Sequence, residues 1–458
     1  MRIDLAADLR REWALQKALG GRLIALPSMP ILGISTNSEQ VQRGDLFVAL
    51  RGEHTQGLCF VDQALEKGAA AVLCDTEIQL PTGVGLVLHE EPQQALLDAA
   101  AWYRRQCDVK VIAVSGSAGK TTVKEAIAAV LGDVPHSEGN FNSTVGMPLS
   151  VLSVPRAPYW VLELGINHVG EMEKMARALA PDVGVLTNVG TAHVGNFGDF
   201  CTLLAEKTAM ADHLRPGGVM LLPSDLAYVL PQAPLFSTVR FGTGGEVFAE
   251  KIVNDENGVR CDLHGFGRVI TNLTWPVPGR IGVCTLCAVG AVCLWLGGSD
   301  DHIRAGLQRA AAQTPRMRRI VQNGRILLDD CYNASPEAMM AALEVLSIVG
   351  KGRQQIAVLG DMLELGAHSA ALHDALGAYV AQNGDVSLFT WGEDAARIAS
   401  GALRGGLLQE KVQHFEKDAS EALIAAVCRS AGEDAVILFK ASRALRMERI
   451  LEGVRRML

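Results

Sequence analysis

The sequence is poor in aromatic residues and carries little charge of either sign. Aromatic side chains make up 5% of the 458 residues and charged ones 20%, and the formal net charge is -8. Without an excess of positive charge no broad basic surface is expected, which argues against nucleic acid as a partner. Hydrophobic residues reach 49%, which is typical of a soluble globular protein and excludes a disordered or fibrous one.

Signals for export and for zinc are also missing. The stretch from Met1 to Gly21 mixes acidic with basic residues and lacks the apolar core, about 7 to 15 residues long, of a secretory signal. The spacings of the cysteines and histidines do not form a zinc pattern. We therefore expect a reducing, cytoplasmic location.

Only one long apolar segment is present. Residues 281–299 contain no charged side chain and lie between Arg280 and Asp300. The segment is just long enough to span a bilayer, but no second such segment occurs and its glycines favour a buried helix. We expect a core helix and no membrane insertion.

The length predicts about three domains, at about 100 to 200 residues each. We place them at residues 1–85, 86–313 and 314–458. Apolar runs that look like strands alternate with helix-like stretches, which predicts an α/β fold with parallel sheets covered by helices. Strands are expected at 44–50, 70–74, 84–89, 109–114, 160–164, 183–187, 219–222, 326–329, 356–359, 387–390 and 436–439.

A glycine-rich loop follows the strand predicted at 109–114 and precedes a helix. An anion at a helix N-terminus is stabilised by unpaired N–H groups and about half a positive charge. Lys120 can neutralise the β- and γ-phosphates and the Thr121 hydroxyl can reach Mg²⁺. These features predict ATP binding, whereas the alternative is a glycine turn with an exposed lysine. The nucleotide-binding residues expected here are Gly116, Ser117, Ala118, Gly119, Lys120, Thr121 and Thr122.

Two residues separate the glycines of this loop, where the usual triphosphate-binding pattern has four. This shortening points away from most GTPases and motor ATPases. Oxygen ligands for Mg²⁺ should lie at neighbouring strand ends, where Glu163 and, one strand later, His193 are found. A lone histidine is more often a hydrogen-bonded loop residue, but its place at a strand end favours a ligand. From composition alone, we expect Lys207 to be an exposed lysine on a helix.

The spacing of this loop, Glu163, His193 and Lys207 resembles the Mur ligase superfamily, the ATP-dependent amide-forming enzymes of cell-wall assembly. Two further stretches are more specific than the loop: GINHVGEM at 165–172 and DDCYNASP at 329–336. The resemblance spans nearly the whole chain. Its other segments are 44–57, 139–152, 358–366 and 439–450.

The resemblance implies three domains: a UDP-substrate-type N-terminal domain, a central P-loop ATPase domain and a C-terminal Rossmann-like domain. It implies ATP and two magnesium ions, the first on Thr121 and the second on Glu163, His193 and Lys207, the last carbamylated. The implied reaction adds D-alanyl-D-alanine to a UDP-N-acetylmuramoyl tripeptide through an acyl phosphate. The partners are then small molecules, and a monomer is expected.

The resemblance also assigns roles to further residues. Asn142, Arg316 and Asp330 would contact the nucleotide, and Asn167 and His168 would lie near the reacting groups with Lys120. The substrate-binding residues implied are Ser35, Thr36, Asn37, Ser38, Tyr332, Asn333, Lys440, Ser442 and Arg443.

Some positions depart from the family pattern. An acid and an arginine of the N-terminal domain are replaced by Asn37 and Glu39, and polar residues near adenine by Ile281, Gly282 and Thr285. These changes keep two alternatives open. One is a related ligase that joins a different carboxylate and amine in a specialised pathway, and the other is a non-catalytic nucleotide-sensing protein. The intact Lys120, Glu163, His193 and Lys207 argue against the second alternative.

Overall fold

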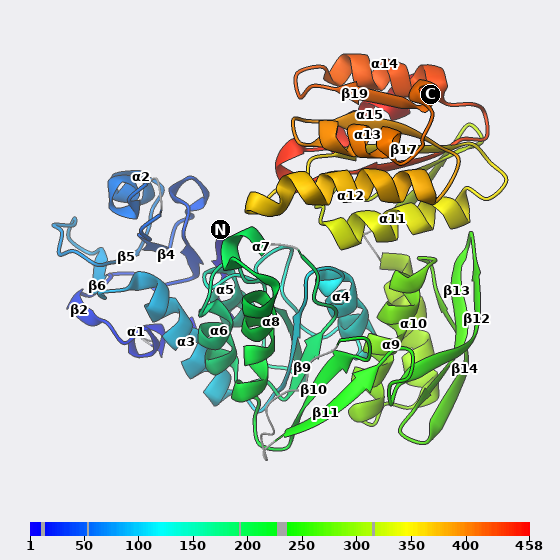
Figure 1. Ribbon diagram of the computed structural model, residues 1–458. Helices are drawn as coiled ribbons and strands as arrows, with labels where there is room; N and C mark the ends of the chain where they lie inside the picture. The colour runs from blue at the N-terminus through cyan, green and yellow to red at the C-terminus, as the bar shows by residue number, and fades with distance from the viewer. Residues whose placement is uncertain (11–13, 53–54, 192–193, 227–235, 314–316) are drawn as a thin grey trace.

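A computed structural model describes the chain from residue 1 to 458, except residues 11–13, 53–54, 192–193, 227–235 and 314–316. Three bodies follow one another along the chain (Figure 1). The N-terminal body lies at the left, the central body at the lower right, and the C-terminal body above the central one. The predicted α/β architecture of three domains is confirmed. The boundaries at residues 85 and 313 stay predictions, and strand β6 of the first sheet runs to Leu88.

The N-terminal sheet has six strands in the order β1-β3-β4-β5-β6-β2. The inner four are parallel, and β1 and β2 pair antiparallel at the edges. Strands β4, β5 and β6 confirm the three strands predicted in this part of the chain. The elements are β1 Arg2–Asp4, α1 Ala14–Leu19, β2 Arg22–Ala25, β3 Gly33–Ser35, β4 Asp45–Val48, α2 Val61–Glu66, β5 Ala71–Cys74, β6 Gly85–Leu88 and the following helix α3 Pro92–Gln106.

The central sheet consists of five parallel strands in the order β11-β10-β9-β7-β8. The residues of β7, β8, β9 and β10 are almost all buried because helices cover both faces, so the predicted apolar runs are confirmed as strands. Neighbouring strands end at the same edge, which places the loops after β7, β8 and β9 side by side. The strands are β7 Lys110–Ser115, β8 Tyr159–Glu163, β9 Val183–Leu186, β10 Gly218–Pro223 and β11 Phe236–Phe241, and the helices are α4 Lys120–Val130, α5 Gly146–Ser153, α6 Glu171–Leu179, α7 Val194–Phe197 and α8 Phe200–Thr208.

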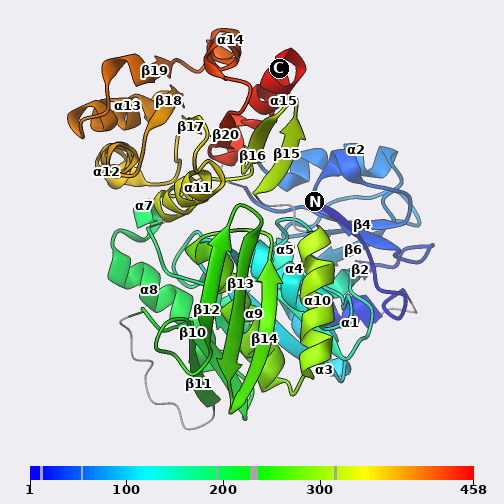
Figure 2. The same cartoon turned by 90° about the vertical axis from the view of Figure 1, so that its right-hand side faces the viewer.

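The long apolar segment forms helix α9, Arg280–Trp295, which contacts α4 and β13 and is buried over most of its length. A three-stranded antiparallel sheet, not predicted from the sequence, covers it, and helix α10 lies alongside (Figure 2). Cys284 and Cys287 form a CxxC spacing inside α9, but burial raises the pKa of the Cys287 thiol to about 12. No described helix is both long and apolar enough to cross a bilayer. The added elements are β12 Phe248–Asp255, β13 Gly258–Gly265, β14 Arg268–Trp275 and α10 Asp300–Gln313.

The C-terminal sheet runs β15-β16-β20-β17-β18-β19, with only β15 antiparallel. Strand β20, the last in the chain, lies in the middle between β16 and β17. Residues that follow β16 therefore lie beside residues that end β20, although about 110 positions separate them. The elements are β15 Arg318–Gln322, β16 Arg325–Asp329, α11 Pro336–Val349, β17 Gln355–Gly360, α12 Ser369–Gln382, β18 Val386–Trp391, α13 Ala395–Arg404, β19 Val412–Phe415, α14 Ser420–Ser430, β20 Val436–Lys440 and α15 Glu448–Met457.

The role of α9 as a core helix is testable with a matched pair of leucines. Leu286 in α9 is fully buried, whereas Leu408 is 58% exposed. We expect Leu286→Ala to lower the free energy of unfolding by about 2 to 5 kcal/mol through lost burial and a cavity. Leu408→Ala should change it by less than about 0.5 kcal/mol. Urea denaturation followed by circular dichroism measures both, and equal effects would contradict the burial of α9.

Candidate active site

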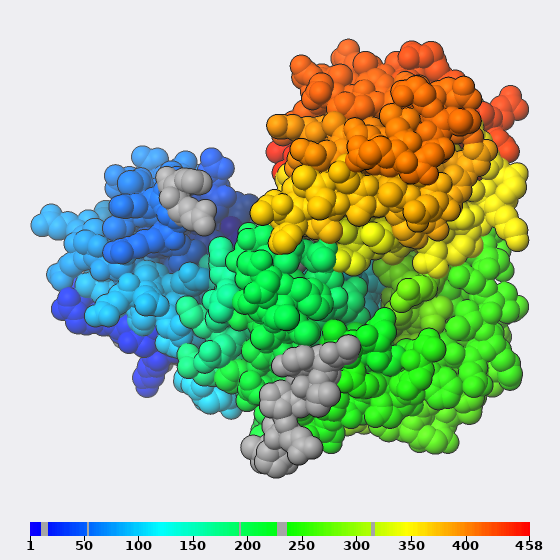
Figure 3. Space-filling view, in the orientation of Figure 1, coloured from blue at the N-terminus to red at the C-terminus, as the bar shows by residue number. Residues whose placement is uncertain are grey.

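A cavity of about 580 Å³ lies where the central and C-terminal domains meet. In the space-filling view the C-terminal residues lie directly against the central ones (Figure 3). The central domain contributes the glycine-rich loop and the ends of β8 and α8, and the C-terminal domain contributes the segments after β16, β17 and β20. The residues that line the cavity include Ser117, Ala118, Gly119, Lys120, Thr121, Thr122, Asn142, Glu163, Asn167, Lys207, Asp330, Tyr332, Asn333, Lys440, Ser442 and Arg443.

The glycine-rich loop requires glycine at two positions. Gly116 has φ +145° and a Cβ there would lie 2.0 Å from the Thr187 hydroxyl oxygen, so only glycine leaves room for the loop after β9. Gly119 has φ +79° and caps α4, and the space beside it is open. The loop therefore presents its backbone to the cavity at the N-terminus of α4, as a phosphate-binding loop requires.

The loop after β9 holds this glycine-rich loop in place. The Asn188 side-chain oxygen accepts hydrogen bonds from the backbone N–H groups of Ser117 at 3.0 Å and Ala118 at 2.8 Å. The Ser117 hydroxyl accepts from the Gly190 N–H at 2.9 Å. Asn188 and Gly190 were not predicted from the sequence, because their partners in the glycine-rich loop lie about 70 residues away in the chain.

Two lysines of the central domain line the cavity. Lys120 donates a hydrogen bond to the Gly116 carbonyl at 2.7 Å. Lys207, near the end of α8, is only 2% exposed, so the expectation of an exposed lysine drawn from composition is wrong. Burial, together with the positive charge of Lys120, lowers the pKa of Lys207 to about 7, although Glu206 opposes the shift. A substantial fraction of Lys207 is therefore a neutral amine near neutral pH.

Glu163 ends β8 and is buried, with 2% of its surface exposed. One carboxylate oxygen accepts from the Thr121 hydroxyl at 2.9 Å and the other from the Asn142 amide at 2.8 Å. The structure thus brings three predicted site residues into direct contact.

The backbone of Glu163 is fixed by two residues that sequence reasoning missed. Its N–H donates to the Ser137 hydroxyl at 3.0 Å, and the buried Lys124 ammonium donates to the Ser137 carbonyl at 2.6 Å. Neither residue carries a motif signal. In the sequence Lys124 looks like an ordinary helical lysine, and its burial becomes visible only when α4 is packed on the sheet.

The C-terminal side of the cavity is built around Lys440, at the end of β20. Lys440 is 3% exposed, forms an ion pair with Asp330 and donates to the Asn333 carbonyl at 2.9 Å. The Arg443 guanidinium lies 5.9 Å from the centre of the Tyr332 ring, within cation–π range. These predicted substrate residues therefore form one cluster.

The remaining predicted residues divide into three groups. Asn167 lines the cavity, whereas His168 is exposed and does not line it. The backbone N–H groups of both donate to the Glu171 carboxylate. His193 and Arg316 lie outside the described residues, so their predicted roles stay predictions.

Three residues near the expected adenine site, Ile281, Gly282 and Thr285, differ from the family pattern, and the structure shows their local surroundings. Ile281 and Thr285 both line the cavity, and the Thr285 hydroxyl donates to the Ile281 carbonyl at 2.8 Å. A Cβ at Gly282 would lie 2.0 Å from the Val277 carbonyl oxygen. Position 282 therefore excludes an asparagine with the present backbone.

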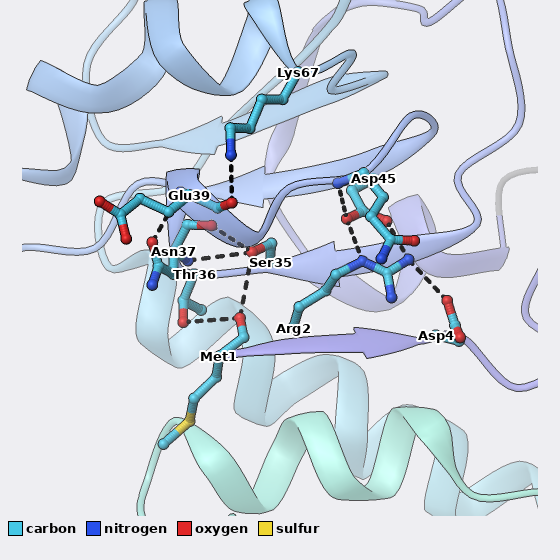
Figure 4. Close-up of polar contacts among 10 residues, drawn as sticks. Met1, Arg2, Asp4, Ser35, Thr36, Asn37, Glu39, Asp45 and Lys67 are labelled. Atoms are coloured by element: carbon cyan, nitrogen blue, oxygen red, sulfur yellow. Dashed lines mark hydrogen bonds and ion pairs between the residues drawn. The ribbon is translucent and has the colours of Figure 1, made fainter.

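A second cavity of about 620 Å³ lies at the N-terminal domain and is lined by Asn37 and Glu39. The other predicted residues of this stretch bind nearby groups: the Ser35 hydroxyl donates to the Asn37 carbonyl, and the Ser38 hydroxyl donates to Gln63 (Figure 4 shows the former). Thr36 Oγ1 lies 3.4 Å from the Met1 carbonyl.

Arg2, at this second cavity, forms ion pairs with two carboxylates, Asp4 and Asp45. The guanidinium donates to the Asp45 carboxylate at 2.8 Å, and that carboxylate is fully buried (Figure 4). Lys67 donates to the backbone carbonyl of Glu39, so the Glu39 carboxylate is not its partner. The cavity therefore offers an acid at Glu39 where the family pattern has a cation.

Three family descriptions match the chain. The Mur ligase family catalytic domain matches residues 30–129, the Mur ligase middle domain 114–293, and the Mur ligase glutamate ligase domain 315–443. The UDP-N-acetylmuramoyl-tripeptide–D-alanyl-D-alanine ligase of Bacillus subtilis (strain 168) is 33% identical, over 93% of this chain and 93% of the relative. The enzyme of the same name from Escherichia coli (strain K12) is 30% identical, over 92% and 93%.

Solved structures agree with these relatives. A crystal structure of MurF from Acinetobacter baumannii is 29% identical and covers 99% of both chains with a TM-score of 0.86. The MurF ligase of Thermotoga maritima in complex with ADP is 27% identical, with a TM-score of 0.80 over 93% of this chain and 97% of that one.

The collision at Gly116 gives a test of the phosphate loop. We expect Gly116→Ala to lower the affinity for ADP at least about tenfold, because the methyl group displaces Thr187 and distorts the loop. Gly132→Ala is the matched control, since Gly132 has φ +98° but no atom within 4 Å of its Cβ position. The control should lose about 1 kcal/mol of stability and keep its affinity. Calorimetric titration with ADP decides, and unchanged binding by Gly116→Ala would exclude the loop as the nucleotide site.

Proposed function

Since the chain belongs to the Mur ligase family, we propose that it is an ATP-dependent ligase that adds D-alanyl-D-alanine to UDP-N-acetylmuramoyl tripeptide in peptidoglycan precursor synthesis. The observation that carries the proposal is the meeting, in one cavity, of a phosphate loop, a buried carboxylate and cations from two domains. The proposal includes a monomer that acts on small molecules in the cytoplasm. A different acid and amine are not favoured, because relatives matching nearly the whole chain share this one activity.

The residues present fit a Mg²⁺-bound triphosphate. Gly119 leaves the loop backbone open to the cavity, Gly116 leaves room for Thr187, and Lys120 lies at the N-terminus of α4. Thr121 and Glu163 supply hard oxygen donors 2.9 Å apart, the type of ligand that Mg²⁺ prefers. In this proposal Thr121 holds a first ion, and Glu163, His193 and Lys207 hold a second. Asn142, Arg316 and Asp330 complete the nucleotide site.

ATP supplies the phosphoryl group that activates the substrate carboxylate as an acyl phosphate, and Mg²⁺ spreads the charge of that group. Lys120 adds positive charge at the end of the cradle. Lys440, Ser442 and Arg443 from the C-terminal domain close on the substrates, with Tyr332 and Asn333 beside them. Docking of this domain excludes water, which would otherwise hydrolyse the activated carboxylate before the amine attacks.

Lys207 is suited to carbamylation. The neutral amine, favoured by a pKa of about 7, can add CO₂ and lose a proton, which turns a repelling cation into an oxygen donor. Within the described part of the chain no group of three or more His, Cys, Asp or Glu side chains is placed to hold a metal. A carbamate on Lys207 would add a second acidic group to the cavity that Glu163 lines.

The proposed reaction predicts a strict dependence on both substrates. Phosphate release should saturate with UDP-N-acetylmuramoyl tripeptide and require D-alanyl-D-alanine, with one amide product for each phosphate. Lys120→Met should reduce turnover by about 10³-fold, because the transferring phosphoryl group loses a cation. No product from this chain, while the Bacillus subtilis enzyme is active in the same assay, would overturn the proposal.

Carbamylation predicts a pH-dependent modification at one lysine. Below a pH of about 7 Lys207 holds its proton and cannot add CO₂, so carbamate should increase as the pH rises through about 7. Carbon-13 NMR in labelled bicarbonate measures this increase. Lys207→Arg should remove the signal and lower kcat about 100-fold or more. Lys174→Met, at an exposed lysine of the same domain, is the control, and it should leave the signal in place.

A further inference from the structure

The loop after β9 touches two partners at once: the phosphate loop of its own domain and helix α11 of the C-terminal domain. Residues 188–191 make both sets of contacts within four consecutive positions. Hydrogen bonds on both of its sides link this loop to the cradle and to the neighbouring domain. The loop is therefore the place where docking of the C-terminal domain can act on the cradle.

The contact with α11 is made by the carboxylate of Glu337. One oxygen accepts from the Thr191 N–H at 2.6 Å and from the Thr191 hydroxyl at 2.9 Å. A Cβ at Gly190 would lie 2.3 Å from the carboxyl carbon of Glu337, so the carboxylate packs directly on the backbone of the loop. Glu337 lies in the first turn of α11, where the helix dipole favours a negative charge.

The same loop holds the cradle on its other side. The Gly190 N–H donates to the Ser117 hydroxyl, and that hydroxyl lies 3.2 Å from the Gly190 carbonyl. The Asn188 side-chain oxygen accepts hydrogen bonds from the backbone N–H groups of Ser117 and Ala118. One peptide unit, between Gly190 and Thr191, thus separates the bonds to Ser117 from the bonds to Glu337.

The second oxygen of Glu337 is buried and has no hydrogen-bond partner among the described residues. A buried carboxylate oxygen without a partner costs free energy, so this contact is a poor device for stability alone. The segment that leads into α11 carries Asp330, Tyr332 and Asn333 into the cavity. Fixing the start of α11 therefore fixes the C-terminal side of the site.

We propose that Glu337 is a positioning residue that sets the register between the docked C-terminal domain and the phosphate cradle through Thr191 and Gly190. The inference rests on the proposed ligase function and adds a residue to its machinery. Glu337 touches no reacting atom. It acts by holding the loop that carries Asn188 and the segment that carries Asp330 and Asn333 in one fixed relation.

The test compares Glu337→Ala with Arg319→Ala. Arg319 also joins the two domains, through hydrogen bonds to the Glu256 backbone and carboxylate, but it does not line the cavity. We expect Glu337→Ala to lower kcat by about 10- to 100-fold, the loss that matches one or two charge-assisted hydrogen bonds. ADP affinity should stay within about threefold, because Asn188 and Ser117 still hold the cradle. Glu337→Gln keeps an oxygen for Thr191 and should recover most of kcat.

Three outcomes would overturn the proposal: a kcat for Glu337→Ala equal to that of Arg319→Ala, a parallel loss of kcat, ADP affinity and thermal stability, or no recovery by Glu337→Gln. Small-angle scattering gives a readout independent of activity. The radius of gyration should increase for Glu337→Ala relative to Arg319→Ala as the C-terminal domain leaves its docked position, and no difference would also overturn the proposal. Absence of ligation by the unmodified chain would instead reject the proposed function.

Discussion

The common ending of β7, β8 and β9 at one edge of the central sheet is the constraint on which the site depends. Parallel strands place their carboxyl ends together, so the phosphate loop, Glu163 and the Asn188 loop become neighbours although the chain separates them widely. The contact between Thr121 and Glu163 follows from this arrangement. Buried bonds to Ser137 and Asn188 then fix each loop, so the cradle is set before any substrate arrives.

The C-terminal domain adds Lys440 and Arg443 to a cavity in which the central domain supplies the loop backbone, Glu163 and its own lysines. Lys440 is almost completely buried and forms an ion pair with Asp330. This ion pair fixes the orientation of its side chain. Lys120 of the central domain supplies a cation at the N-terminus of α4. The site therefore gathers positive charge from two domains around the position where a triphosphate would bind, and neither domain is complete without the other.

Much of the fold could be predicted from the sequence, because parallel strands covered on both faces are continuous apolar runs. Strand β12 escaped prediction because six consecutive residues are exposed, and in β12 and β14 the residues Lys251 and Asn272, with positive φ, interrupt the alternation. In the site, Lys120 and Glu163 follow from spacing and strand position. Lys207 came only from the family resemblance, because its burial depends on how α8 packs. Ser137 and Glu337 act on backbone groups and leave no pattern in the sequence.

The position of β20 has a consequence for synthesis of the protein. The final strand of the chain occupies the interior of its sheet, so β16 and β17 have no common neighbour until residues 436–440 have left the ribosome. During synthesis the edges of β16 and β17 that later pair with β20 therefore have no partner strand. The N-terminal and central domains can fold in this period, because all their strands have already been made. A polypeptide that stops short of β20 therefore contains the whole glycine-rich loop but lacks Lys440 and the strand that joins β16 to β17.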